Sequence, residues 1–207
     1  MNQSAKFWDR NAVRYSKRKV SDEAAYQKKL QVTRDYFRSD MEVLEFGCGT
    51  GSTAIAHAPY VRHIRAIDIS SKMIEIAQEK AHAANVKNVT FEQSTVEEIS
   101  TSDESLDAVL GLSVLHLLED KEAVIGKVHR MLKPGGIFVS STICLGGRMK
   151  FLKVIVPIGK FFGLMPSVKF LTAQELQDSL TDAGFEIDHQ WQPGKGIAVF
   201  IVATKAA

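Results

Sequence analysis

Cysteine is scarce in this chain of 207 residues, which has only Cys48 and Cys144. Two distant cysteines make neither a disulfide framework nor a zinc-ligand spacing, so we expect a protein of the reducing cytoplasm with no metal site. A secretory signal is not indicated, because the first 19 residues are polar and basic. Charge of one sign is also missing: 26 Lys and Arg against 24 Asp and Glu leave a net charge of +2, so we expect no nucleic-acid partner.

Helical and strand patterns alternate along most of the sequence. We expect strands at 41–46, 63–69, 89–93, 105–112, 137–144, 185–191 and 197–204, and helices at 22–38, 52–58, 72–84, 120–131 and 172–183, with a further helix before residue 22. Ser21 is expected to cap the helix 22–38, and residues 134–136 to form a turn. The alternation predicts a parallel sheet with right-handed crossovers, and the short loop 193–196 makes the last two strands antiparallel neighbours.

One stretch, V-L-E-F-G-C-G-T-G at 43–51, places three alternate glycines between a predicted strand and a predicted helix. Such a turn offers backbone N–H groups to a nucleotide-like ligand. The third glycine comes one place too early for a dinucleotide site, and Glu45 would repel a pyrophosphate but suit an ammonium group. Asp68, at the end of the next predicted strand, can accept both hydroxyls of a ribose. S-adenosylmethionine has an ammonium, a sulfonium and no phosphate, so it fits this pattern.

These residues resemble a known family. E-x-G-C-G-T-G at 45–51, A-I-D-I-S at 66–70 and L-K-P-G-G at 132–136 look like the motifs of class I S-adenosylmethionine-dependent methyltransferases. The resemblance implies an α/β, Rossmann-like, doubly wound sheet of seven strands, mostly parallel with one reversed strand. It also implies a single domain over 1–207, divided into an N-terminal helical lid (1–40), a cofactor-binding core (41–144), a substrate-side insertion (145–170) and a C-terminal helix and strand pair (171–207).

The resemblance places the cofactor on residues of these motifs and of the predicted lid. The glycines make room for it, Glu45 helps to hold its amino-acid end, Asp68 binds its ribose, and Gly111 and Leu112 offer carbonyls near its ammonium. The expected cofactor contacts are Tyr15, Glu45, Gly47, Cys48, Gly49, Gly51, Asp68, Ile69, Met73, Thr95, Val96, Gly111 and Leu112. One position departs from the family: Ser94-Thr95-Val96 stands where an acid usually binds the adenine amino group, so Thr95 and the N–H of Val96 are expected there.

Several of these residues have a simpler explanation. Met73 and Cys48 are also expected as ordinary packing residues, and Tyr15 is as well explained by packing of its helix as by a cofactor contact. For Trp8 we favour packing. His116, just past the fourth predicted strand, is a candidate general base or acceptor contact, and the alternative is a half-exposed histidine at a helix start.

The segment 145–170 is rich in Phe, Leu, Ile and Val, and its charges are all basic. Its lysines and Pro157 interrupt the apolar run, so it is too short to span a membrane. We expect either an ordinary amphipathic helix packed on the sheet or a lid over an apolar acceptor that rests on an anionic membrane surface.

The sequence therefore predicts a methyltransferase that uses S-adenosylmethionine on a small-molecule or lipid-like acceptor. Two alternatives stay open at this point. One is an NAD(P)-binding oxidoreductase, which the glycine spacing and the absence of an evident Tyr-x-x-x-Lys pair disfavour. The other is a regulator that binds S-adenosylmethionine without catalysis.

Overall fold

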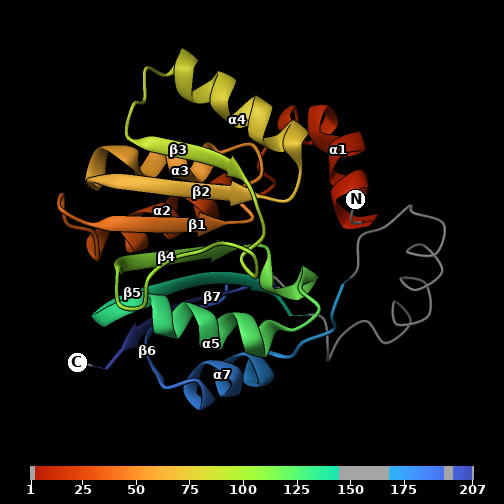
Figure 1. Cartoon of the computed structure of the whole chain (residues 1–207). Coiled ribbons are helices and arrows are strands. Elements are labelled where there is room, and N and C mark those ends of the chain that lie inside the picture. Colours follow the sequence, from red (N-terminus) through yellow and green to blue (C-terminus); the bar gives the residue numbers. More distant parts are fainter. Residues whose placement is uncertain (1–2, 145–167, 194–197, 207) are drawn as a thin grey trace.

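Seven strands form one sheet at the centre of the computed structural model, which describes residues 3–144, 168–193 and 198–206 (Figure 1). The strands are β1 Glu42–Phe46, β2 His63–Asp68, β3 Val89–Gln93, β4 Leu106–Leu112, β5 Leu132–Ile143, β6 Phe185–Trp191 and β7 Ala198–Lys205. Their order is β3-β2-β1-β4-β5-β7-β6, and β7 runs antiparallel to both β5 and β6 while the other pairs are parallel. The predicted seven-stranded sheet with one reversed strand is confirmed.

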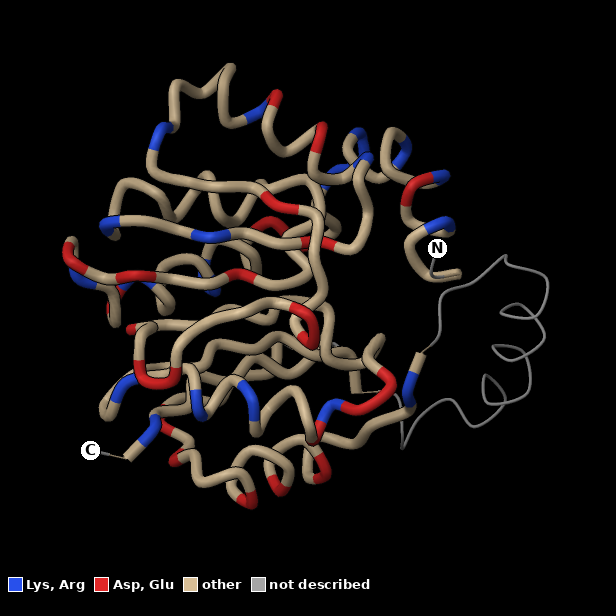
Figure 2. The backbone as a smooth tube through the Cα atoms, viewed as in Figure 1, with Lys and Arg blue, Asp and Glu red and all other residues tan. Residues whose placement is uncertain are grey.

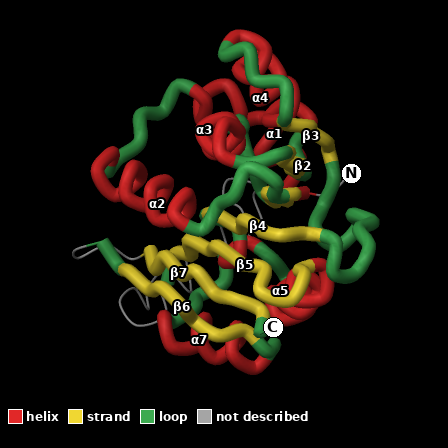
Figure 3. Tube along the Cα trace, turned by 90° about the vertical axis from the view of Figure 1, so that its left-hand side faces the viewer, coloured by secondary structure: helices red, strands yellow, loops and turns green. Residues whose placement is uncertain are grey.

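Helices cover both faces of this sheet. They are α1 Gln3–Ser16, α2 Glu23–Asp35, α3 Ser52–His57, α4 Ser71–Ala83, α5 Lys121–Met131 and α7 Ala173–Asp182, with short 3-10 helices η1 Ala58–Tyr60 and η2 Leu115–Leu117. Because side chains alternate along a strand, Val109 packs with α5 and α7 while Leu110 packs with α3 and α4. Figures 1 and 3 show α5 on one side of the sheet and α2 and α3 on the other.

Positive and negative side chains are interspersed over most of the described chain (Figure 2), as the small net charge leads one to expect. Within the described ranges, no helix is long and apolar enough to cross a bilayer. Apart from residues 168–170, the predicted insertion 145–170 lies outside the described residues.

The helix caps illustrate how far local sequence determines helix ends. The predicted capping box of α7 is present, because Thr172 Oγ1 accepts from Glu175 N at 3.1 Å and Glu175 Oε2 accepts from Thr172 N at 2.7 Å. The prediction for α2 is wrong by one residue: Asp22, not Ser21, is its N-cap, and the Asp22 carboxylate accepts from Ala25 N at 2.9 Å. Both residue types cap well, but the helix begins at Glu23, so the residue directly before it takes the N-cap position.

Strand β5 begins earlier than predicted. Residues 134–136 do not separate a helix from a strand that starts at Ile137, because β5 already begins at Leu132. The expected turn survives as an irregularity in the pairing, in which Leu106 pairs with Leu132 but Ala108 pairs with Ile137. Gly135 has a φ of +74°, so the glycine sequence does bend the chain, but inside a strand.

Candidate active site

The turn between β1 and α3 brings glycine backbone close to other parts of the chain. Gly47, Gly49 and Gly51 all have positive φ, at +64°, +53° and +74°. A Cβ on Gly47 would lie 2.7 Å from Val114 Cγ2, and one on Gly51 would lie 2.7 Å from Phe91 Cε1. A side chain at either position would therefore meet both strain and a clash. At Gly49 there is more room, since a Cβ there would meet only Tyr15 Cε1, at 3.7 Å.

Asp68 ends β2 and ties this turn in place. Its Oδ2 accepts from Gly49 N at 2.9 Å, and its Oδ1 accepts from Ser70 N at 2.9 Å. Burial raises the pKa of the carboxyl, and the two backbone donors oppose that rise. Each carboxylate oxygen has a further lone pair, so Asp68 can still accept hydrogen bonds from two hydroxyls of a ligand.

Glu45 lies on β1 beneath the same turn. The residue is 3% exposed, and its Oε2 has no hydrogen-bond partner among the described residues. Burial raises the pKa of Glu45 to about 8, and the nearby Asp68 adds to the shift. A buried acid without a partner suits a cationic group, because an ammonium beside it would stabilise the ionised form.

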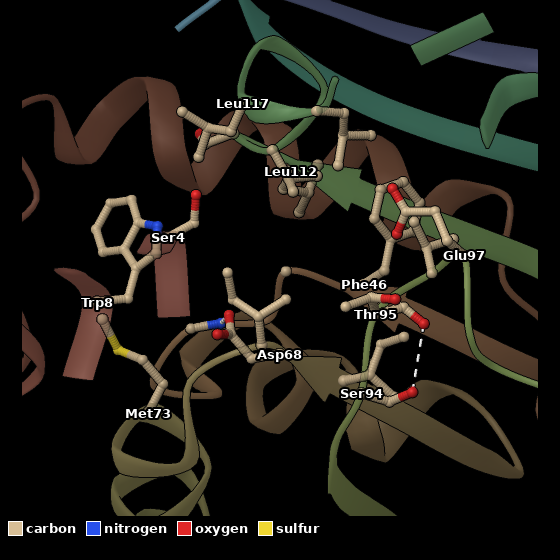
Figure 4. Close-up of a pocket in the computed structure, with 18 of the residues that line it drawn as sticks. Ser4, Trp8, Phe46, Asp68, Met73, Ser94, Thr95, Glu97, Leu112 and Leu117 are labelled. Carbon is tan, nitrogen blue, oxygen red and sulfur yellow. Dashed lines mark hydrogen bonds between the residues drawn. The ribbon is translucent and has the colours of Figure 1, made fainter. Parts of the chain in front are cut away.

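A cavity lies at the carboxyl ends of the neighbouring strands β1 and β4 (Figure 4). The strand order reverses at this point, because the chain continues from β1 to β2 and β3 on one side and from β4 to β5 on the other, and ligands bind at such points in sheets of this kind. Most of the predicted cofactor residues line it, namely Tyr15, Gly47, Gly49, Asp68, Ile69, Met73, Thr95, Val96 and Leu112. The structure thus gathers residues from five separate segments of the chain into one site.

Comparison with known proteins decides what kind of site this is. A family model described as "Methyltransferase domain" matches residues 37–195, which is most of the chain.

The chain belongs to the methyltransferase domain family.

Individual relatives agree with this assignment. The chain is 32% identical over 132 residues to the "Uncharacterized methyltransferase YcgJ" of Bacillus subtilis, covering 64% of this chain and 52% of the relative. It is 34% identical over 156 residues to a "Ubiquinone biosynthesis O-methyltransferase" of Rickettsia canadensis, covering 72% and 64%. The chain therefore spans about half to two thirds of the length of these curated relatives. The crystal structure of YcgJ has the same fold, with a TM-score of 0.72 at 20% identity, over 87% of this chain and 99% of that one.

The cofactor of this methyltransferase family is S-adenosylmethionine, and the residues present fit it. Gly47 and Gly49 of the turn form a cradle in the cavity wall, Asp68 offers free lone pairs, and Glu45 has a buried oxygen without a partner among the described residues that suits an ammonium. The expected cofactor is thus supported by observations that are independent of one another. The comparisons give no support to the NAD(P)-binding alternative.

Some predicted residues of the methyltransferase lie just outside the cavity walls. Glu45 on β1, and Cys48 and Gly51 in the turn itself, do not line the cavity, and the buried Cys48 donates its N–H to Ile67 O at 3.0 Å. Gly111 is also set back, and a Cβ on it would lie 2.5 Å from Phe46 Cζ. The close approach of an aromatic ring therefore explains this glycine without any ligand.

The structure adds wall residues that sequence reasoning missed, namely Ser4, Trp8, Phe46, Ile67, Ser94, Glu97, Ser113, Val114, Leu117 and Leu118. Trp8 does more than pack its helix: it lies opposite Met73 at the cavity, and its ring meets Tyr15 edge-on at 6.1 Å between centroids. The spacing of seven between Trp8 and Tyr15, two helical turns, was a signal that they share a face. Glu97 is an exposed acid two residues after Thr95, and it also lines the cavity. It therefore lies close to Ser94-Thr95-Val96, the positions at which the family usually has an acid.

His116 is buried rather than half-exposed. It lies on η2 with 5% exposure, and its Nδ1 has no partner among the described residues. Its carbonyl accepts from Lys169 N at 2.7 Å. Burial lowers the pKa of the ring to about 4, so the imidazole is neutral near pH 7. The cavity wall is formed by its neighbour Leu117, because successive residues of a 3-10 turn face different directions.

Proposed function

We propose that the chain transfers a methyl group from S-adenosylmethionine to a small or lipid-like acceptor with a substantial apolar part. The cavity itself carries the proposal. One side of it holds Asp68 and the glycine turn, and the other side holds apolar side chains such as Leu112, Leu117 and Trp8 (Figure 4). A cofactor site and an apolar pocket that share one opening are what transfer between two bound molecules requires.

When bound, S-adenosylmethionine supplies an electrophilic methyl group on a sulfonium. The chain's own residues then have three tasks. Asp68 and the glycine turn fix the cofactor end of the site. Leu112 and Leu117 keep water away from it, and α1 covers the opening with Trp8 and Tyr15. Holding the reactants and excluding water supply most of what such a displacement needs.

A general base is needed only for an acceptor that must lose a proton. His116 remains our candidate for this role, because its ring is neutral near pH 7 and its Nδ1 has no partner among the described residues, although Leu117 and not His116 lines the cavity. Its low pKa makes it a weak base. His116 would therefore serve an acceptor with an acidic hydroxyl better than an aliphatic alcohol.

The names of several relatives support an acceptor of this kind. The Rickettsia proteins are ubiquinone biosynthesis O-methyltransferases, and this name specifies an oxygen as the methyl acceptor in those proteins. We extend to this chain only the class, an acceptor with an apolar part. A cytoplasmic location, the division into four segments and a membrane contact through residues 145–170 stay predictions. Sedimentation with anionic vesicles at low salt tests the last of them.

The deciding experiment has two stages. Melting temperatures with S-adenosylmethionine, S-adenosylhomocysteine or NAD test the site, since a ligand that binds the native state raises the melting temperature. Transfer of label from S-adenosylmethionine into small molecules of a cell extract then identifies the acceptor. Stabilisation by S-adenosylmethionine with no transfer to any extract fraction would instead favour a non-catalytic regulator.

A further inference from the structure

Helix α1 presents one face to the cavity. Ser4, Trp8 and Tyr15 are spaced by four and seven residues, so they share a side of the helix, and all three line the cavity (Figure 4). Tyr15 reaches furthest: its Cε1 lies 3.7 Å from the place where a Cβ of Gly49 would be. The helix therefore covers the same glycine turn that Asp68 holds from below.

The fully buried side chains of α1 are few and small. The buried residues of this helix are Ala5 and Ala12, whose side chains are single methyl groups. Burial of such side chains contributes much less than burial of a Leu or Phe. Phe7 and Trp8 are half-buried and add apolar contacts, so polar contacts act together with these in fixing the place of the helix.

Asp9 makes such a contact, on the side of α1 that faces α4. Its Oδ1 accepts from Ser70 Oγ at 2.6 Å and from the backbone N–H of Lys72 at 3.3 Å. Ser70 is the N-cap of α4 and accepts from Met73 N at 3.2 Å. Asp9 thus supplies a second capping group to α4 from another helix, at the end where the helix dipole favours a negative charge.

The contact is continuous with the cofactor site. A serine hydroxyl has one hydrogen, and Ser70 donates it to Asp9, which leaves its lone pair for Met73 N. The backbone N–H of Ser70 donates to Asp68 Oδ1, and Asp68 Oδ2 accepts from Gly49 N. Hydrogen bonds therefore connect α1, the N-terminus of α4, the ribose carboxylate and the glycine turn in one series.

From this geometry we propose that Asp9 is a positioning residue that latches α1 over the bound cofactor and so sets the rate at which the cofactor leaves. The inference rests on the proposed function, because it takes S-adenosylmethionine as the ligand of the cavity. Breaking the contact between Asp9 and Ser70 frees α1 with its wall residues, while Asp68 and the glycine turn stay in place.

The test compares release rates. Tritiated S-adenosylhomocysteine is bound to the protein and chased with an excess of unlabelled ligand. The loss of a charge-assisted hydrogen bond in Asp9→Ala is expected to speed release by roughly tenfold or more. Asp9→Asn keeps an acceptor oxygen in the same place, so it is expected to restore much of the slow release. In a Trp191→Phe background Trp8 is the sole tryptophan, and acrylamide is expected to quench its fluorescence more efficiently after Asp9→Ala.

Asp120→Ala is the matched control, because Asp120 caps α5 by accepting from Ala123 N at 2.9 Å. It removes a capping carboxylate of the same kind and is expected to leave both release and quenching unchanged. Wild-type release and quenching in Asp9→Ala, or equal changes in Asp120→Ala, would overturn the latch. If the wild-type chain binds no labelled ligand, the proposed function fails separately, and the quenching of Trp8 still decides whether Asp9 fixes α1. Should Asp9→Ala not fold, Asp9→Ser, whose shorter hydroxyl does not reach Ser70 Oγ, carries both measurements.

Discussion

Glu45 makes the stability of the cofactor-free protein depend on pH in an unusual direction. Its carboxyl is fully enclosed and one of its oxygens has no partner among the described residues, and burial raises its pKa from 4.5 to about 8. The unfolded chain loses the Glu45 proton at the ordinary pKa, while the folded chain keeps it up to about pH 8. Between these values the native state binds more protons than the unfolded state.

The free energy of unfolding must then fall as the pH rises. A full proton of difference corresponds to about 1.4 kcal/mol per pH unit, so from about pH 5 to pH 7 the loss is roughly 3 kcal/mol. Glu45→Gln has nearly the same shape and never ionises. We expect the variant to lose this part of the pH dependence and to be more stable than the wild type near pH 7. Loss of the carboxylate that we expect to hold the ammonium should also weaken the binding of S-adenosylmethionine.

Urea unfolding at several pH values between about 5 and 7, without cofactor, measures the effect directly. Glu42→Gln serves as the control, since Glu42 lies on the same strand with a much more exposed side chain that pairs with Arg62. The wild type and Glu42→Gln should lose stability in parallel as the pH rises, and Glu45→Gln should not. Parallel curves for all three proteins would refute the reasoning, because Glu45 would then ionise normally in the folded state.

Three further outcomes follow from the site. Asp68→Asn turns an amide NH₂ toward one of two backbone donors and loses a ribose acceptor, so calorimetry should show affinity for S-adenosylhomocysteine reduced by tenfold or more; unchanged affinity would remove Asp68 from the site. Gly51→Ala brings a methyl group to within 2.8 Å of Ala77 Cβ at a positive φ, so its melting temperature should fall and binding should be lost, whereas normal binding would contradict the cradle. His116→Ala should lower the free energy of unfolding by about 1–3 kcal/mol in urea, since the ring is buried. A role in proton transfer requires that its turnover falls further than that of Leu176→Ala, a control that is destabilised to the same extent.

Sequence patterns predicted the strands well because each carries its own evidence. Residues 89–93 and 185–191 were predicted with the bounds that β3 and β6 have, since each is a β-rich run between turn signals. The start of β5 could not be predicted in this way. Its first residue belongs to the strand because Leu132 pairs with Leu106 of β4. A short stretch of sequence around Leu132 contains no information about this distant partner.

The residues of the site also differ in whether the local sequence could predict them. The glycines and Asp68 were predictable, because a sharp turn and an acid at a strand end leave a local signature. Leu117, Leu118 and Ser4 left none, since their place in the cavity depends on how η2 and α1 pack on the rest of the chain. The expected carbonyl contact of Gly111 stays a prediction, and the structure adds that its missing Cβ makes room for the ring of Phe46.

The position of β7 has a consequence for how the chain comes to be folded during synthesis. β7 follows all the other strands in the sequence, yet it lies between β5 and β6 and pairs with both. Until residues 198–205 have left the ribosome, β5 is an open edge and β6 has no neighbour, and open edges are templates for pairing between chains. The cofactor half of the sheet can assemble early, while the other half stays incomplete until the last strand inserts. Nascent chains that stop before Ala198 are therefore expected to be recognised by chaperones or to aggregate, although all the described residues that line the cavity have already been made.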